Sequence, residues 1–141
     1  MAELLEKSFP VEAGAFTTAG EASTTIKRTL KQLGVGAEVL RRVSVACYEV
    51  ELNLVIHSLG GTLTLLVDPD KVTLISKDVG PGIPDIEKAM TEGFSTASDE
   101  ARTLGFGAGM GLPNMKRYSD EMTIDTELGV GTTIKMRIYM N

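Results

Sequence analysis

The sequence predicts an α+β fold, a two-layer sandwich with helices on one face of a mixed, mostly antiparallel sheet. After a short edge strand, two helical patterns lie at about 17–33 and 37–58. Two β-rich runs follow across the short link Asp68-Pro69-Asp70-Lys71, which is typical of an antiparallel hairpin. A further helix and a second pair of β-rich runs complete the order. A doubly wound parallel sheet is disfavoured, because it needs strands and helices in regular alternation.

Turn residues and apolar spacing predict the first half of the chain. Residues 4–13 are expected to form an edge strand that ends near Pro10 and Gly14. Each of the two following helices carries an apolar stripe at spacings of three and four and ends at glycine. The stripes are Ala22, Ile26, Leu30 and Leu33, before Gly34, and Val43, Cys47, Val50 and Leu54, before Gly60-Gly61. Cys47, the only cysteine, is therefore expected to be a buried and unreactive thiol.

The second half is predicted to contain strands at 62–67 and 72–76, a short helix at 86–90 and an unpatterned loop at 92–103. A helix at 112–119 and strands at 122–126 and 132–139 follow. A chain of 141 residues is long enough for one domain with a single core.

The composition excludes several classes of protein. A net charge of −5 and a pI near 4.9 give no positive field that could hold nucleic acid or an anionic membrane. The first residues are charged rather than apolar, and no apolar run approaches the ~20 residues needed to span a bilayer. We expect a soluble, cytoplasmic domain in which any polyphosphate is held by local groups.

Three polar residues share one side of the second predicted helix. Glu49, Asn53 and His57 lie four residues apart, beside the apolar stripe, so they are expected to border the core. Glu51, two residues from Glu49, should point away from that side. An Asn oxygen suits Mg²⁺, and a Glu one turn earlier could accept a proton from a hydroxyl or water.

Two glycine-containing segments predict contacts with a nucleotide. Asp78 ends an apolar run, where a carboxylate can accept a hydrogen bond from the amine of adenine, and Gly80 and Gly82 let the backbone approach a flat ring. The glycines between Gly105 and Gly111 leave N–H groups free to bind phosphate where a helix begins at Leu112. No strand precedes this segment, as a Rossmann motif requires, and it lacks the Gly-Lys-Ser/Thr of a P-loop.

Taken in order, these segments resemble the N, G1 and G2 boxes of the GHKL (Bergerat-fold) ATPase superfamily. The greatest similarity is to the anti-sigma-factor serine/threonine kinases of bacterial partner-switching modules. It includes residues 78–86, Gly93-Phe94-Ser95-Thr96 and Gly131-Thr132-Thr133, and runs from about residue 15 to the end. The resemblance implies a single GHKL-type ATP-binding kinase domain over 1–141, with an ATP lid at about 92–109.

The same resemblance implies a role for each motif residue. Asn53 would hold Mg²⁺ and Glu49 would be the catalytic base. Asp78 would bind adenine, with Gly82 against the ring and Thr132 or Thr133 supporting the water network behind it. The other implied cofactor-binding residues are His57, Gly80, Ile83, Ser95, Thr96, Gly105, Phe106, Gly107, Ala108, Gly109, Met110, Gly111 and Leu112.

The implied reaction is transfer of the γ-phosphoryl group of ATP to a serine or threonine of a STAS-type anti-anti-sigma partner. A sigma factor or a phosphatase regulator is a further candidate partner, and a homodimer is a candidate assembly. Two alternatives stay open: an ATP-gated anti-sigma or adaptor module without catalysis, and a histidine kinase-like catalytic domain. The second is disfavoured because the only histidine, His57, lies within the predicted site helix.

Overall fold

The computed structural model describes residues 5–12, 14, 19–57, 60–80, 82, 83, 90 and 111–140, with only the backbone of 56, 57 and 111. The elements in chain order are β1 (Leu5–Val11), α1 (Glu21–Gln32), α2 (Ala37–His57), β2 (Gly61–Val67), β3 (Lys71–Asp78), α5 (Gly111–Tyr118), β4 (Glu121–Glu127) and β5 (Gly131–Tyr139). None of these helices is long and apolar enough to cross a membrane.

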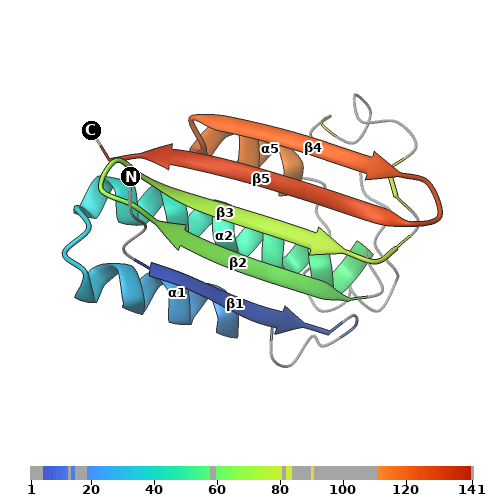
Figure 1. Ribbon diagram of the computed structural model, residues 1–141, viewed down its shortest axis with the longest axis horizontal. Helices are drawn as coiled ribbons and strands as arrows, with labels where there is room; N and C mark the ends of the chain where they lie inside the picture. The colour runs from blue at the N-terminus through green and yellow to red at the C-terminus, as the bar shows by residue number, and fades with distance from the viewer. Residues whose placement is uncertain are drawn as a thin grey trace.

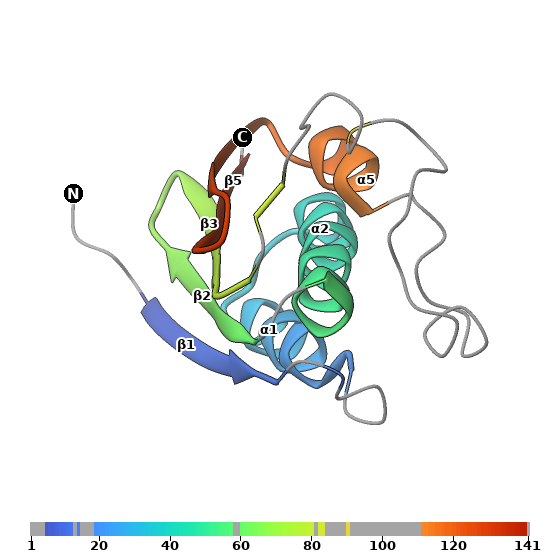
Figure 2. The same cartoon turned by 90° about the vertical axis from the view of Figure 1, so that its right-hand side faces the viewer.

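The described strands form one sheet in the order β1-β2-β3-β5-β4, and every pair in it is antiparallel. The described helices cover one face of this sheet, with α2 between α1 and α5 (Figure 1, Figure 2). The predicted α+β sandwich is confirmed. β5, the last of these strands in the sequence, lies between β3 and β4 and links β4 to the rest of the sheet.

The core lies between α2 and the sheet. All four members of the predicted stripe of α2 (Val43, Cys47, Val50 and Leu54) are fully buried. They belong to the same hydrophobic core as alternate residues of β2 and β5, such as Leu63 and Met136, as the period of a half-buried strand requires. Burial raises the pKa of the Cys47 thiol, and the Glu51 charge adds to that effect, so this thiol is unreactive as expected.

Two element boundaries differ from the prediction for physical reasons. Helix α1 begins at Glu21 rather than near residue 17, because Gly20 has a left-handed backbone (φ 100°) that a continuing helix cannot contain. Strand β3 continues to Asp78, two residues past the predicted end, because its register with β2 runs on to Gly61. The helix expected at 86–90, apart from Met90, and the loop expected at 92–103 lie outside the described residues.

Candidate functional site

Polar side chains from three strands and a helix gather at one end of the molecule. The C-terminal ends of α2 and β3 both lie there (Figure 1). Asp78 is the last residue of β3, and it continues the inward-facing row of Leu74 and Ser76. Thr132 of β5 is buried and pairs across the sheet with Thr126 of β4. These residues therefore face the helical layer rather than the open face of the sheet.

The carboxylate of Asp78 is half satisfied. The Thr132 N–H donates to its Oδ1 atom over 2.8 Å, while Oδ2 has no hydrogen-bond partner among the described residues. Burial raises the pKa of Asp78, and the hydrogen bond from Thr132 partly opposes that rise. Gly131 permits this arrangement, because a Cβ there would overlap the Asp78 carbonyl oxygen and lie 3.2 Å from Oδ1. The free oxygen can accept a hydrogen bond from a ligand amine.

The turn after β3 is hydrogen-bonded to the β4–β5 hairpin. Gly80 N–H donates to the Val130 carbonyl over 3.2 Å, and Ile83 N–H donates to Thr126 Oγ1 over 2.8 Å. Gly82 has φ 79°, and a Cβ at this position would lie 2.8 Å from the Glu127 carbonyl oxygen. The sequence predicted that Gly80 and Gly82 contact a ring, and it did not indicate that Gly82 also allows the turn to approach the hairpin.

On α2, the predicted polar row borders the core as expected. Glu49 is half-buried, and Asn114 Nδ2 of α5 donates to its Oε2 over 3.3 Å. Asn53 is half-buried, and its side chain makes no hydrogen bond to another described residue. His57 ends the helix, but its side chain lies outside the described part. Asn114 was not predicted as a site residue, although its position in the helix that follows the glycine segment could have indicated it.

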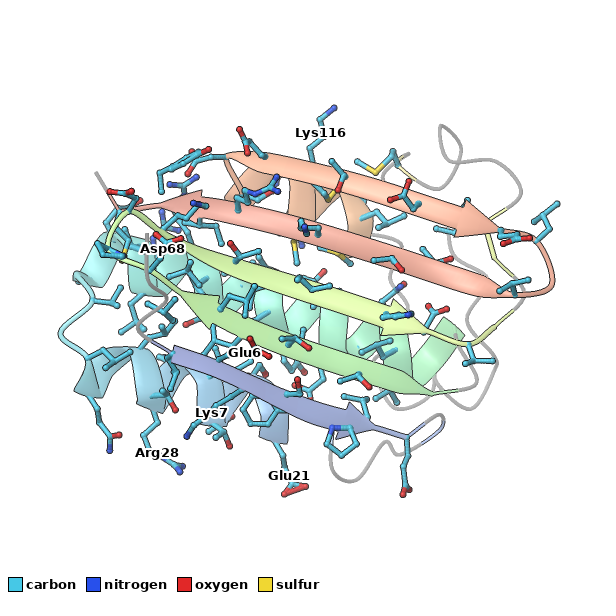
Figure 3. All side chains as sticks on the ribbon, viewed as in Figure 1. Glu6, Lys7, Glu21, Arg28, Asp68 and Lys116 are labelled. Carbon is cyan, nitrogen blue, oxygen red and sulfur yellow. The ribbon has the colours of Figure 1, made fainter. Side chains whose placement is uncertain are left out.

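Glu51 faces away from Glu49, as predicted, but its role was not foreseen. Charged residues such as Arg28 and Lys116 point outward (Figure 3), whereas Glu51 is only 3% exposed. Its carboxylate accepts the N–H groups of Gly20, Ala22 and Ser23 over 3.0, 3.2 and 2.8 Å. It thereby caps α1, whose N-cap residue is a glycine without a side-chain hydrogen bond.

The family model of histidine kinase-, DNA gyrase B- and HSP90-like ATPases matches residues 38–141. The chain belongs to this family. It is similar to the serine/threonine-protein kinase RsbT of Bacillus subtilis (strain 168), with 34% identity over 113 residues, 77% of this chain and 79% of the relative. It is also similar to the anti-sigma F factor of Thermoanaerobacter sp. (strain X514), with 32% identity over 124 residues, 84% of this chain and 83% of the relative.

Membership of this ATPase family implies that the chain uses ATP. Thr132 and Thr133, the two threonines predicted to lie near adenine, are not equivalent, because neighbouring residues of a strand face opposite sides of the sheet. Thr132 lies beside Asp78, whereas Thr133 faces the open side of the sheet. Gly111 and Leu112 begin α5, and Leu112 packs in the core.

The remaining predicted residues, Ser95, Thr96 and the segment 105–110, lie outside the described residues. Within the described part, no three His, Cys, Asp or Glu side chains form a group that could hold a metal ion. A magnesium ion bound by one or two protein ligands together with phosphates and water needs no such group. The half-buried Asn53, with its side-chain oxygen available, fits that kind of site.

Proposed function

We propose that this chain is an ATP-binding serine/threonine protein kinase of the partner-switching type. It transfers the γ-phosphoryl group of ATP to a serine or threonine of a STAS-type anti-anti-sigma protein. Its membership of the ATPase family and its similarity to RsbT support this proposal. The observation that carries it is the placement of Glu49 and Asn53 on one side of α2, with Asn114 from the helix after the glycine segment bonded to Glu49.

In the proposed complex, Asp78 binds the adenine. Its Oδ2 accepts a hydrogen bond from the exocyclic amine, while Oδ1 stays on the Thr132 N–H. The segment 105–110 and the start of α5 hold the phosphates, because N–H groups at a helix N-terminus favour anions. This arrangement accounts for polyanion binding by a chain with a net charge of −5.

Transfer requires a base and an offset of negative charge. Asn53 would ligate Mg²⁺, which neutralises charge on the phosphates when bound. Glu49, one helical turn away, accepts the proton of the partner's hydroxyl as its oxygen bonds to the γ-phosphorus, and ADP leaves. Asn114 holds the Glu49 carboxylate in one orientation through its amide. The single, buried Cys47 is consistent with work in a reducing cytoplasm.

The nucleotide assignment is tested by calorimetry with ATP and Mg²⁺. We expect Asp78→Asn and Asn53→Ala to abolish binding, because the first removes the acceptor for the amine and the second removes the metal ligand. Unchanged affinity in both variants would refute the assignment. Thr123→Val on the exposed side of β4 is a suitable control that should bind like the wild type.

The kinase assignment is tested by transfer of radiolabel from ATP to a STAS protein recovered by pull-down with and without ATP. Glu49→Ala should retain ATP binding and lose transfer. Equal labelling by this variant and the wild type would remove Glu49 as the base.

A second candidate function is an ATP-gated anti-sigma module that binds a sigma factor or a phosphatase regulator without catalysis. It is favoured by the similarity to proteins named anti-sigma F factors. ATP-dependent capture of a partner that never becomes labelled would support it over the kinase.

A further inference from the structure

Three hydrogen bonds connect the turn after β3 to the carboxylate of Asp78. Ile83 N–H donates to Thr126 Oγ1 over 2.8 Å, and Thr126 Oγ1 lies 3.0 Å from Thr132 Oγ1. The Thr132 N–H then donates to Asp78 Oδ1 over 2.8 Å. The family resemblance implied a role for Thr132 but none for Thr126.

The first bond favours one direction of hydrogen bonding through these groups. A backbone N–H can only donate, so Thr126 Oγ1 accepts from Ile83. Hydrogen bonds strengthen one another when each hydroxyl accepts one and donates the next. Either hydroxyl can donate in the Thr126–Thr132 bond, but only donation from Thr126 to Thr132 Oγ1 lets Thr126 accept one bond and donate the next. That direction leaves the Thr132 proton for an acceptor beyond these three groups. Thr132 is only 5% exposed, so a mismatched partner at its hydroxyl would cost binding energy.

The site then presents an acceptor beside a donor. The acceptor is Asp78 Oδ2, and the donor, for a Thr126 proton directed at Thr132, is the Thr132 hydroxyl. Adenine offers the complementary pattern, an amine donor beside ring-nitrogen acceptors, whereas guanine has a carbonyl acceptor where adenine has its amine. A bridging water would pass the same direction on to the base, because it would accept from Thr132 and donate to the ring nitrogen.

We propose that Thr126 is a specificity-determining positioning residue, which selects adenine over guanine by holding the Thr132 hydroxyl as a donor. This inference rests on the proposed binding of adenine at Asp78. Without the Thr126 hydroxyl, the Thr132 hydroxyl can rotate and accept instead, so a base with a ring N–H is rejected less strongly. The methyl-for-hydroxyl exchange Thr126→Val removes the hydroxyl and preserves the shape.

The experiment measures Kd for ATP and for GTP, each with Mg²⁺, in wild type, Thr126→Val, Thr126→Ser and the control Thr123→Val. Thr123 lies on the same strand and faces the opposite side of the sheet. We expect the GTP-to-ATP Kd ratio to fall about tenfold in Thr126→Val, which is the value of one hydrogen bond. Thr126→Ser should restore the wild-type ratio, and Thr123→Val should not change it.

A purely structural role for Thr126 predicts a different result, in which Thr126→Val weakens both nucleotides equally and the ratio stays constant. That result, together with loss of ATP binding in Asp78→Asn, would overturn the Thr126 inference alone. Retained ATP binding in Asp78→Asn would instead overturn the proposed adenine site. If Thr126→Val does not fold, the GTP-to-ATP Kd ratio is measured in Thr126→Ala, which also removes the hydroxyl. The ratio should again fall about tenfold, and an unchanged ratio would overturn the inference.

Discussion

Replacing Glu51 with alanine removes the acceptor of three backbone N–H groups at the start of α1. The bonds to Ala22 and Ser23 are buried and the bond to Gly20 is partly buried, so water cannot fully replace the carboxylate. Each buried donor left without an acceptor costs about 1–3 kcal/mol, and removal of a buried charge offsets part of the sum. We expect Glu51→Ala to lower the free energy of unfolding by about 2–4 kcal/mol.

Thermal unfolding followed by circular dichroism measures this effect. For a domain of this length, 1 kcal/mol corresponds to roughly 4 °C, so Tm should fall by about 8–15 °C. The Tm of Glu51→Gln should fall by less, because the glutamine amide oxygen can still accept hydrogen bonds from backbone N–H groups, while its NH₂ group cannot. Glu38→Gln is the control, because the Glu38 side chain is 72% exposed and pairs with Arg41 at the surface, where an ion pair contributes little.

Hydrogen exchange localises the effect. The amides of Ala22 and Ser23 should exchange faster in Glu51→Ala than in wild type, because α1 frays from its uncapped end. A Tm within 2 °C of the wild-type value, with unchanged exchange at these amides, would refute the capping argument.

Three further outcomes are expected. Asn114→Ala should slow phosphoryl transfer about tenfold without changing ATP affinity, because the Glu49 carboxylate loses the amide that orients it. Single-turnover and binding assays measure the two quantities, and an equal loss of transfer rate and ATP affinity would count against this role of Asn114. Gly82→Ala should lower the free energy of unfolding by at least about 1 kcal/mol, because alanine at φ 79° is strained and its Cβ would meet the Glu127 carbonyl. Urea unfolding measures this effect, and a midpoint equal to that of the wild type would contradict it. ATP affinity should weaken as the pH falls toward the raised pKa of Asp78, because a protonated carboxyl is a poorer hydrogen-bond acceptor. A Kd for ATP that does not change from pH 7 to pH 4 would argue against Asp78 as the residue that contacts adenine.

Local patterns were enough to predict the described helices and strands and the positions of Asp78 and the polar row of α2. The apolar stripe of α2 predicted its buried face, and the position of Asp78 at the end of a β-rich run predicted a carboxylate at the edge of the sheet. Both signals depend on residues only a few positions apart, which is the range over which helix and strand periodicity acts.

The residues that hold the site in place were not predictable in this way. Glu51 binds groups 28–31 residues earlier, Asn114 binds Glu49 across 65 residues, and Ile83 binds Thr126 across 43 residues. Glu51 and Asn114 resemble ordinary polar residues of a helix, and Thr126 resembles any threonine of a strand. Only the tertiary arrangement of α1, α5 and β4 gives each of them a partner.

The central position of β5 has a consequence for synthesis of the protein. Asp78 is made 54 residues before Thr132, the source of its N–H donor, and β3 and β4 are joined only when β5 inserts between them. In a nascent chain that lacks β5, β4 therefore has no partner strand, β3 has one unpaired edge, and the proposed adenine site lacks the Thr132 N–H. With adenine bound at the proposed site, ATP would stabilise only the finished chain, and truncated molecules would remain open to proteolysis.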